Sequence, residues 1–187
     1  MADPYVYPGT KVLINKEDIR DAETLAKFER LETANRMEKL PAGIPIAADG
    51  FLAIHRHIFQ NIYEWAGRIR TVDIAKNDDM FCRVFFIERE LEKRFKSIQA
   101  EDCLRGLTVD AFAQRAAFHI SELNAIHPFR EGNGRTTRAF LEILAEHAGH
   151  PIEIRRIDPV AWIDASRESF RTGDCKLMCA VIAAVIT

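Results

Sequence analysis

The sequence predicts a mainly α-helical fold of about six to eight helices with one β-hairpin. Several long segments place apolar residues three or four positions apart, as the buried face of a helix requires. Only residues 69–87 contain β-prone runs. The 187 residues include no repeat and no Gly/Ser-rich linker, so a single domain spanning 1–187 is expected.

The first half of the chain predicts two helices and the hairpin. Residues 16–40 carry good helix formers and end at Pro41. Asp49 is expected to cap a second helix that continues to Gly67. The runs 69–74 and 80–87, which flank a polar turn at 76–79, then predict the two strands.

The second half predicts helices only. One helix covers 88–101, and another starts after the N-cap Thr108 and ends at about His127, because the next residue is a proline. A helix from 135 closes at Gly149, and two short ones follow around Trp162 and Val181. The apolar end of the chain predicts either a helix docked on the core or a segment cut from a longer polypeptide, of which this domain is the N-terminal part.

Composition excludes several classes of protein. With 48% hydrophobic and 29% charged residues, the chain is typical of a soluble globular protein. Its 26 basic and 28 acidic residues give a net charge of -2, which disfavours a nucleic-acid partner. No apolar run is long enough for a bilayer, so no membrane partner is expected and a reducing cytosol is the expected location. The 4 cysteines lack zinc-site spacing and are expected to be free thiols.

The segment His127–Arg138, HPFREGNGRTTR, carries the predicted chemistry. Three arginines against one carboxylate make it locally positive. Gly132 and Gly134, on either side of Asn133, permit left-handed backbone that turns N–H groups toward one point. The helix that starts next adds free N–H groups and the positive end of its dipole, so the segment predicts a phosphate site.

The side chains of this segment suggest individual roles. Arg135 and Arg138 share a helix face and are expected to reach successive phosphates of a triphosphate. Glu131, the carboxylate beside the glycines, is the candidate Mg2+ ligand. His127 could accept a proton from an attacking hydroxyl, whereas Phe129 is expected to be a structural anchor.

Each feature also has an ordinary explanation. A histidine at a helix end is often solvated, two glycines can form a simple turn, and the arginines and the glutamate could belong to a solvated surface. A helix-turn-helix DNA reader is a further alternative, which the net charge and the lack of a wider basic face disfavour. The joint occurrence of these residues within one short segment favours the nucleotide site.

The segment resembles the signature of the Fic (filamentation induced by cAMP) domain, HPFx[D/E]GNGRxxR, and matches it at every defined position. Upstream, IHRHIFQNIYEWAGRIR is similar to the helix that leads into the family's flap hairpin. The resemblance covers most of residues 50–150, with the flap expected at about 69–87.

This resemblance implies a protein adenylyltransferase that uses ATP and Mg2+ to place AMP on a Ser, Thr or Tyr hydroxyl of a target protein, with release of pyrophosphate. His127 would be the catalytic base, and Glu131 would hold Mg2+. The phosphates would be bound by Gly132, Asn133 and Gly134, with Arg135 on the β and Arg138 on the γ phosphate. The target would dock on the flap as an added strand, near Asp73, Ile74, Lys76, Met80 and Phe81.

The resemblance also bears on regulation. Many Fic proteins carry an inhibitory helix with the motif [S/T]xxxE[G/N]; here only Ser97 has a glutamate at the right spacing, and Asp102 follows that glutamate. A FicT-like (class I) toxin inhibited in trans by an antitoxin protein carrying the helix is therefore expected.

Three points stay open at this stage. A Doc-like phosphotransferase is disfavoured because that branch typically has lysine where this chain has Gly134. A non-catalytic nucleotide-binding module is a second alternative to the adenylyltransferase. The location is the bacterial cytoplasm for a toxin, or a host or recipient cell for a translocated effector.

Overall fold

The computed structural model describes residues 3–76 and 79–187, and its mainly helical architecture confirms the predicted fold class. Within the described residues there are seven α-helices and one two-stranded antiparallel hairpin. The helices are α1 (Ala22–Met37), α2 (Ala48–Phe59), α3 (Ile87–Ala100), α4 (Val109–Ile126), α5 (Asn133–Ala148), α6 (Pro159–Thr172) and α7 (Lys176–Ala183), and the strands are β1 (Ala75–Lys76) and β2 (Asp79–Met80).

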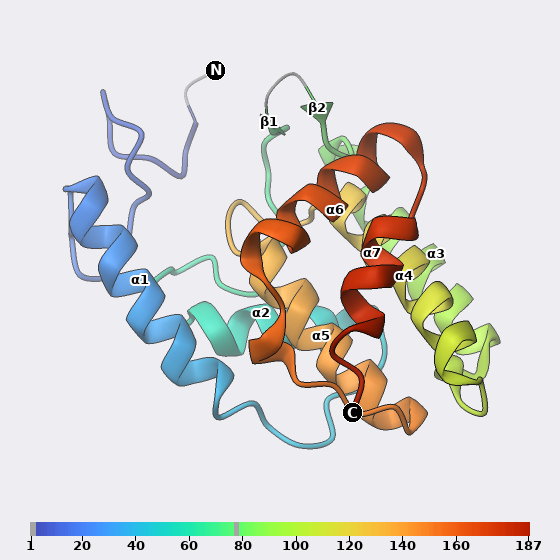
Figure 1. The fold of residues 1–187 in the computed structure, drawn as a ribbon. Coiled ribbons are helices and arrows are strands. Elements are labelled where there is room, and N and C mark those ends of the chain that lie inside the picture. The colour runs from blue at the N-terminus through green and yellow to red at the C-terminus, as the bar shows by residue number, and fades with distance from the viewer. Residues whose placement is uncertain (1–2, 77–78) are drawn as a thin grey trace.

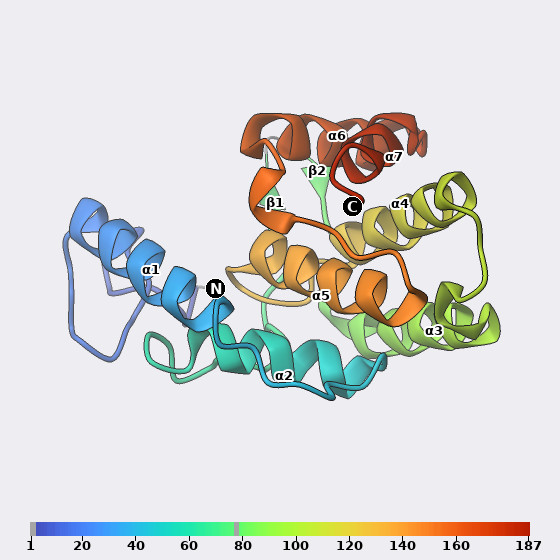
Figure 2. The ribbon, with the colours of Figure 1, turned by 60° about the horizontal axis from the view of Figure 1, so that its bottom comes forward.

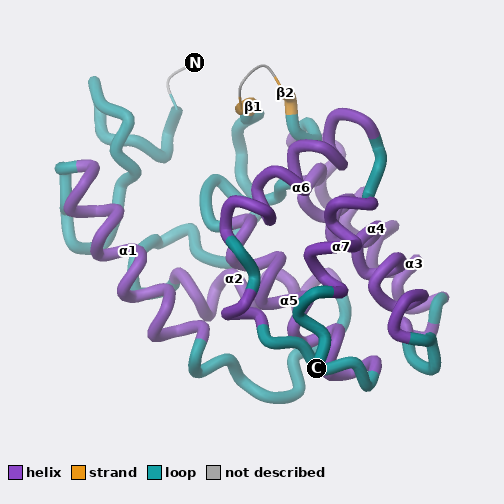
Figure 3. The backbone as a smooth tube through the Cα atoms, in the orientation of Figure 1, coloured by secondary structure: helices purple, strands orange, loops and turns teal. Residues whose placement is uncertain are grey.

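The centre of the fold is α5, which packs against α2 on one side and α4 on the other (Figures 1 and 2). Helices α6 and α7 cover α4, α3 lies along α4, and α1 packs on α2 at the edge of the molecule. The tube in Figure 3 shows how small a part the strands make up. The hairpin and one face of α6 lie close to the loop that joins α4 to α5, which places three elements around one point.

Aromatic rings form the core beneath that loop. Phe51 lies 5.6 Å, centroid to centroid, from both Phe129 and Phe140, and 5.8 Å from Phe95. All four side chains are at most 2% exposed. Because α2, α3, α5 and the loop each contribute a ring, the packing of the core fixes the loop relative to three helices.

The two N-terminal helices are shorter than the sequence predicts. The first begins at Ala22 rather than at residue 16, because Asp21 caps it by accepting from Thr24 N at 2.9 Å. The second begins at Ala48, so Asp49 lies in its first turn and is not the cap. It ends at Phe59 rather than at Gly67, whose φ of +80° marks a separate turn.

The hairpin is confirmed, but the strands predicted at 69–74 and 80–87 are wrong in extent. Backbone N–H groups in these runs bond to other elements: Arg70 N donates to Pro128 O, and Cys82 N to Ala125 O. Residues 84–86 form a 3-10 helix instead of strand. Of the predicted turn at 76–79, residues 77–78 lie outside the described part of the chain.

The later helices match the expectations closely. Thr108 Oγ1 accepts from Ala111 N, α4 stops just before His127, and Gly149 closes α5 in a left-handed conformation. Helix α5 begins at Asn133, two residues earlier than predicted. The apolar C-terminal run docks on the core, since Met178 and Ile182 of α7 are fully buried against α4 and α6. None of the described helices is long and apolar enough to cross a membrane.

Candidate active site

The loop between α4 and α5 turns through a left-handed residue at each end. His127 has φ 49° and ψ 60°, and Gly132 has φ 85°. A Cβ on Gly132 would lie 2.3 Å from the ring of Phe59, so only glycine fits there. The prediction that Gly134 shares this role is wrong: it lies inside α5 without a positive φ.

His127 lies in the cleft with one nitrogen committed and one available. Its Nδ1 is 3.0 Å from the carbonyl oxygen of Asn124, which can only accept, so Nδ1 carries the proton and Nε2 is left as an acceptor. The ring of Phe81 stacks on the imidazole at 3.8 Å. Burial lowers the pKa of His127 to about 4, so the ring is neutral at pH 7.

Phe129 and Asn133 hold the loop's shape. Phe129, the expected structural anchor, is fully buried. The amide of Asn133 accepts from Phe129 N at 2.9 Å and donates to Phe129 O at 2.8 Å. The side-chain amide of Asn133 is thus engaged in hydrogen bonds within the loop, and only its backbone N–H is available to a ligand.

The N-terminus of α5 faces the cleft. No side chain caps this helix. The first N–H groups of a helix lack intrahelical partners, so those of Asn133, Gly134 and Arg135 are free to bind an anion. A Cβ on Gly134 would meet nothing within 4 Å, which leaves open space beside these groups.

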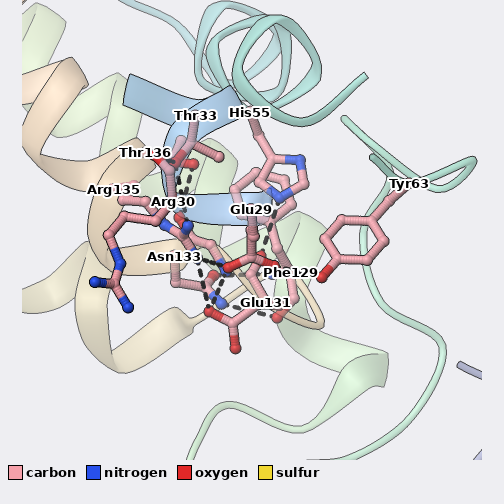
Figure 4. Close-up of polar contacts among 11 residues, drawn as sticks. Glu29, Arg30, Thr33, His55, Tyr63, Phe129, Glu131, Asn133, Arg135 and Thr136 are labelled. Atoms are coloured by element: carbon pink, nitrogen blue, oxygen red, sulfur yellow. Dashed lines mark hydrogen bonds and ion pairs between the residues drawn. The ribbon is translucent and has the colours of Figure 1, made fainter. Parts of the chain in front are cut away.

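The two arginines of α5 differ in their surroundings. The guanidinium of Arg135 is 2.5 Å from Glu29 of α1 and 3.2 Å from Glu131 (Figure 4). It also lies over the ring of Phe59. No ion pair involves Arg138 within the described residues, and its buried Nε has no hydrogen-bond partner there. Burial and the neighbouring Arg135 lower the pKa of Arg138.

Neither arginine lines the cleft. The predicted reach of both side chains toward one ligand is therefore not seen: Arg135 is turned to carboxylates, and Arg138 is half-buried. The spacing of Arg135 and Arg138 predicts that they share a helix face, but it cannot predict that Glu29 of α1 pairs with Arg135.

Glu131 combines an occupied and an available oxygen. Oε1 accepts from Gly132 N at 2.9 Å and pairs with Arg135, while Oε2 makes no contact of this kind with the described residues. The side chain is 46% exposed and lines the cleft. A single carboxylate beside a phosphate site suits Mg2+, which takes its other ligands from water and phosphate oxygens, so the residues present fit this cation.

The cleft has a volume of about 600 Å3 and lies between the loop, the hairpin and α6. The predicted flap residues Asp73, Ile74, Lys76 and Phe81 line it. Met80 does not; it lies on a neighbouring cavity of about 310 Å3 on the other side of Phe81. Helix α6 contributes a further face of the cleft, which the sequence did not predict, because residue spacing predicts a helix face but not what that face covers. This face consists of Trp162, Ile163, Ser166, Arg167 and Phe170.

Arg70 was also missed. Its side chain is fully buried, and Nε donates to His127 O at 2.9 Å while Nη1 donates to Val72 O at 2.7 Å and Nη2 to Cys82 O. One guanidinium thus ties both ends of the hairpin to the backbone of the candidate base. The sequence signal that could have identified it is the occurrence of this arginine within the β-prone run 69–74.

Comparison with known proteins shows the family of the chain. A model of the Fic/DOC family matches residues 45–145. The chain belongs to the Fic/DOC family. It is 41% identical to the probable protein adenylyltransferase y4lH of Sinorhizobium fredii, with 98% of this chain and 96% of the relative covered, and 36% identical to the probable protein adenylyltransferase Fic of Salmonella typhimurium, with 99% and 92% covered.

A solved Fic-fold structure shares the architecture. The BepC protein of Bartonella tribocorum, a VirB-translocated effector with bound AMPPNP, superposes with a TM-score of 0.92 at 26% identity, covering 98% of this chain and 96% of that one. The Fic fold of the present chain thus extends well beyond the segment that the family model matches.

The first prediction concerns the protonation of His127. In an NMR titration its imidazole should have a midpoint near 4 and, at pH 7, a proton on Nδ1, because burial disfavours the cation and Asn124 O accepts from Nδ1. The neutral form is therefore lost only as the pH falls through about 4. Phe81→Ala should raise the midpoint by admitting water. A wild-type midpoint at or above 6.5, or a proton on Nε2, would contradict the geometry.

The second prediction concerns Arg70. Arg70→Met removes charged donors from three partly buried carbonyls, each such bond contributing about 1.5–3 kcal/mol, so the free energy of unfolding in urea should fall by about 3 kcal/mol or more. Arg68→Met, at an exposed position two residues earlier, should change it by less than about 0.5 kcal/mol. Equal free energies of unfolding for the two variants would show that the hydrogen bonds of Arg70 contribute little to stability.

Proposed function

We propose that this Fic protein is a protein adenylyltransferase, which transfers AMP from ATP to a hydroxyl of a target protein and releases pyrophosphate. The observation that carries the proposal is a neutral imidazole with an available Nε2, in a cleft beside the uncapped N-terminus of α5. The names of the relatives and the AMPPNP in the neighbouring structure support the same reaction.

In the proposed reaction, His127 Nε2 accepts the proton of the target's Ser, Thr or Tyr hydroxyl. The hydroxyl oxygen forms a bond to the α-phosphorus, and the bond from that phosphorus to the oxygen bridging to the β phosphate breaks. Pyrophosphate leaves with the electron pair of the broken bond. The low pKa of His127 favours the neutral base at the start but weakens it as a proton acceptor, so positioning and charge neutralisation would supply most of the rate.

The remaining residues would bind and orient the phosphates. The N–H groups from Asn133 to Arg135 would donate to phosphate oxygens, and Arg138 would pair with the γ phosphate. Arg135 would reach the β phosphate by exchanging part of its pairing with Glu29. Glu131 would hold Mg2+, which, when bound, neutralises charge on the phosphates.

The hairpin is the proposed docking edge for the target, because an extended segment could add to it as a strand. Lys76 and Met80 are exposed, and Phe81 lies against His127, so a segment paired with this edge would pass close to the base. Asp73 is occupied locally, since Oδ1 accepts from Val84 N at 2.8 Å, while Ile74 O already accepts from Phe81 N.

For regulation we favour a FicT-like toxin whose antitoxin inserts a glutamate beside Arg138. Support comes from the buried, unpaired Nε of that arginine and from the lack of an inhibitory motif in this sequence. Such a toxin would act in the bacterial cytoplasm. A translocated effector is the alternative, and the similarity to the BepC effector of Bartonella tribocorum supports it. In both cases residues 1–187 would form one Fic domain around a core at 50–150.

The experiment is incubation of the purified chain with ATP labelled at the α phosphate, Mg2+ and a cell lysate, followed by mass measurement of the labelled protein. We expect AMP on a hydroxyl side chain. His127→Ala should reduce the rate by about 100-fold or more, since a positioned base contributes about 10²–10⁴-fold. His147→Ala, at the exposed far end of α5, is the matched control and should keep the rate.

Other outcomes separate the alternatives. Label from the γ position alone would indicate a Doc-like phosphotransferase. Nucleotide binding without any transfer would indicate a binding module. If the chain alone were as inactive as Arg138→Ala, inhibition by a separate antitoxin would no longer explain its regulation.

A further inference from the structure

A fully buried histidine of α2 lies directly beneath the active-site loop. The ring of His55 stacks on Phe129, at the centre of the loop, with a centroid distance of 3.8 Å and an interplanar angle of 14°. It also stacks on Phe59 at 4.6 Å. The side chain is 0% exposed and has no access to the cleft, so its contribution must come through the groups it touches.

Both ring nitrogens of His55 have a defined role. Gly67 N lies 2.8 Å from Nδ1, and since a backbone N–H can only donate, Nδ1 is the acceptor. Nε2 therefore carries the proton and donates to the backbone oxygen of Glu131 at 3.0 Å (Figure 4). The Gly67 turn thus selects the tautomer that holds the carbonyl of Glu131.

That carbonyl belongs to the peptide unit that also holds the Glu131 carboxylate. The C=O of Glu131 and the N–H of Gly132 are two ends of one planar group. Nε2 of His55 binds the oxygen end, and Oε1 of Glu131 accepts from the nitrogen end at 2.9 Å. If the peptide plane rotated, both bonds would break together, and the carboxylate of Glu131 would lose the contact that holds it at the edge of the cleft.

We propose that His55 is a positioning residue for Glu131: by holding the Glu131–Gly132 peptide plane, it sets the carboxylate that receives the divalent cation of the nucleotide. This rests on the proposed function for the identity of the cation and the nucleotide. The role is that of an outer partner of a metal ligand, a class whose loss typically costs 10–100-fold in metal affinity.

The test uses three variants and measures binding rather than turnover. His55→Phe keeps the stacking on Phe129 but removes both hydrogen bonds. The amide of His55→Gln can reach as far as Nε2 and restore a donor to Glu131 O. The shorter His55→Asn restores only the acceptor for Gly67 N. His57→Phe is the matched control, because His57 lies on the same helix but bonds Arg36 of α1.

Calorimetry should give the affinity for ATP as Mg2+ is titrated, and again with the cation chelated. In His55→Phe and His55→Asn, the apparent Mg2+ affinity of the ATP complex should fall by about 10–100-fold. His55→Gln should recover most of it, and His57→Phe should match the wild type. ATP affinity without Mg2+ should change little in all of them, because the α5 N-terminus is intact.

Thermal unfolding of the same samples identifies variants that are merely unfolded. Should His55→Phe fail to fold, the comparison of Gln with Asn still decides the matter. The proposal is overturned if folded His55→Phe or His55→Asn keeps the wild-type Mg2+ dependence, or if ATP affinity falls equally with and without Mg2+. A wild-type chain that binds ATP in this Mg2+-dependent way but transfers no AMP would refute the proposed function while leaving the role of His55 intact.

Discussion

The packing of the α4–α5 loop onto buried rings is the constraint on which the rest of this structure depends. Phe129 is enclosed by Phe51 and His55, and Gly132 rests so closely on Phe59 that no Cβ fits. These contacts force the chain through left-handed turns at His127 and Gly132. Such turns are costly for a non-glycine residue, and here the surrounding core over-determines them. The strain at His127 lies where the chemistry is proposed.

From this constraint the electrostatics of the site follow. The turn at His127 places its imidazole under Phe81, where burial keeps it neutral, while Arg70 holds the same residue's carbonyl together with the two ends of the hairpin. The turn at Gly132 leads the chain into α5 without a cap, so free N–H groups meet the cleft. The proposed proton acceptor and the proposed anion site thus lie at opposite ends of one short loop.

The sequence predicts the helix ends on either side of this loop well because that information is local. Thr108 begins a helix with its own side chain, Pro128 and Gly149 end helices through their backbone conformations, and the HPFREGNGRTTR segment carries its candidate functional groups in one run. What could not be predicted depends on distant partners. Glu29 meets Arg135 only because α1 packs on α2, and the α6 face meets the cleft only after the chain has returned past α5. The strands proved short for the same reason: their N–H groups bond to the α4 end and the loop.

The most direct test of the account is a crystal structure of this chain with Mg2+ and AMPPNP. The account predicts phosphate oxygens within hydrogen-bond distance of the N–H groups of Asn133, Gly134 and Arg135, with the cation on Glu131 and His127 Nε2 facing the α-phosphorus across a space for one hydroxyl oxygen. Phosphates bound elsewhere, or an imidazole turned so that Nε2 points into the core, would contradict it.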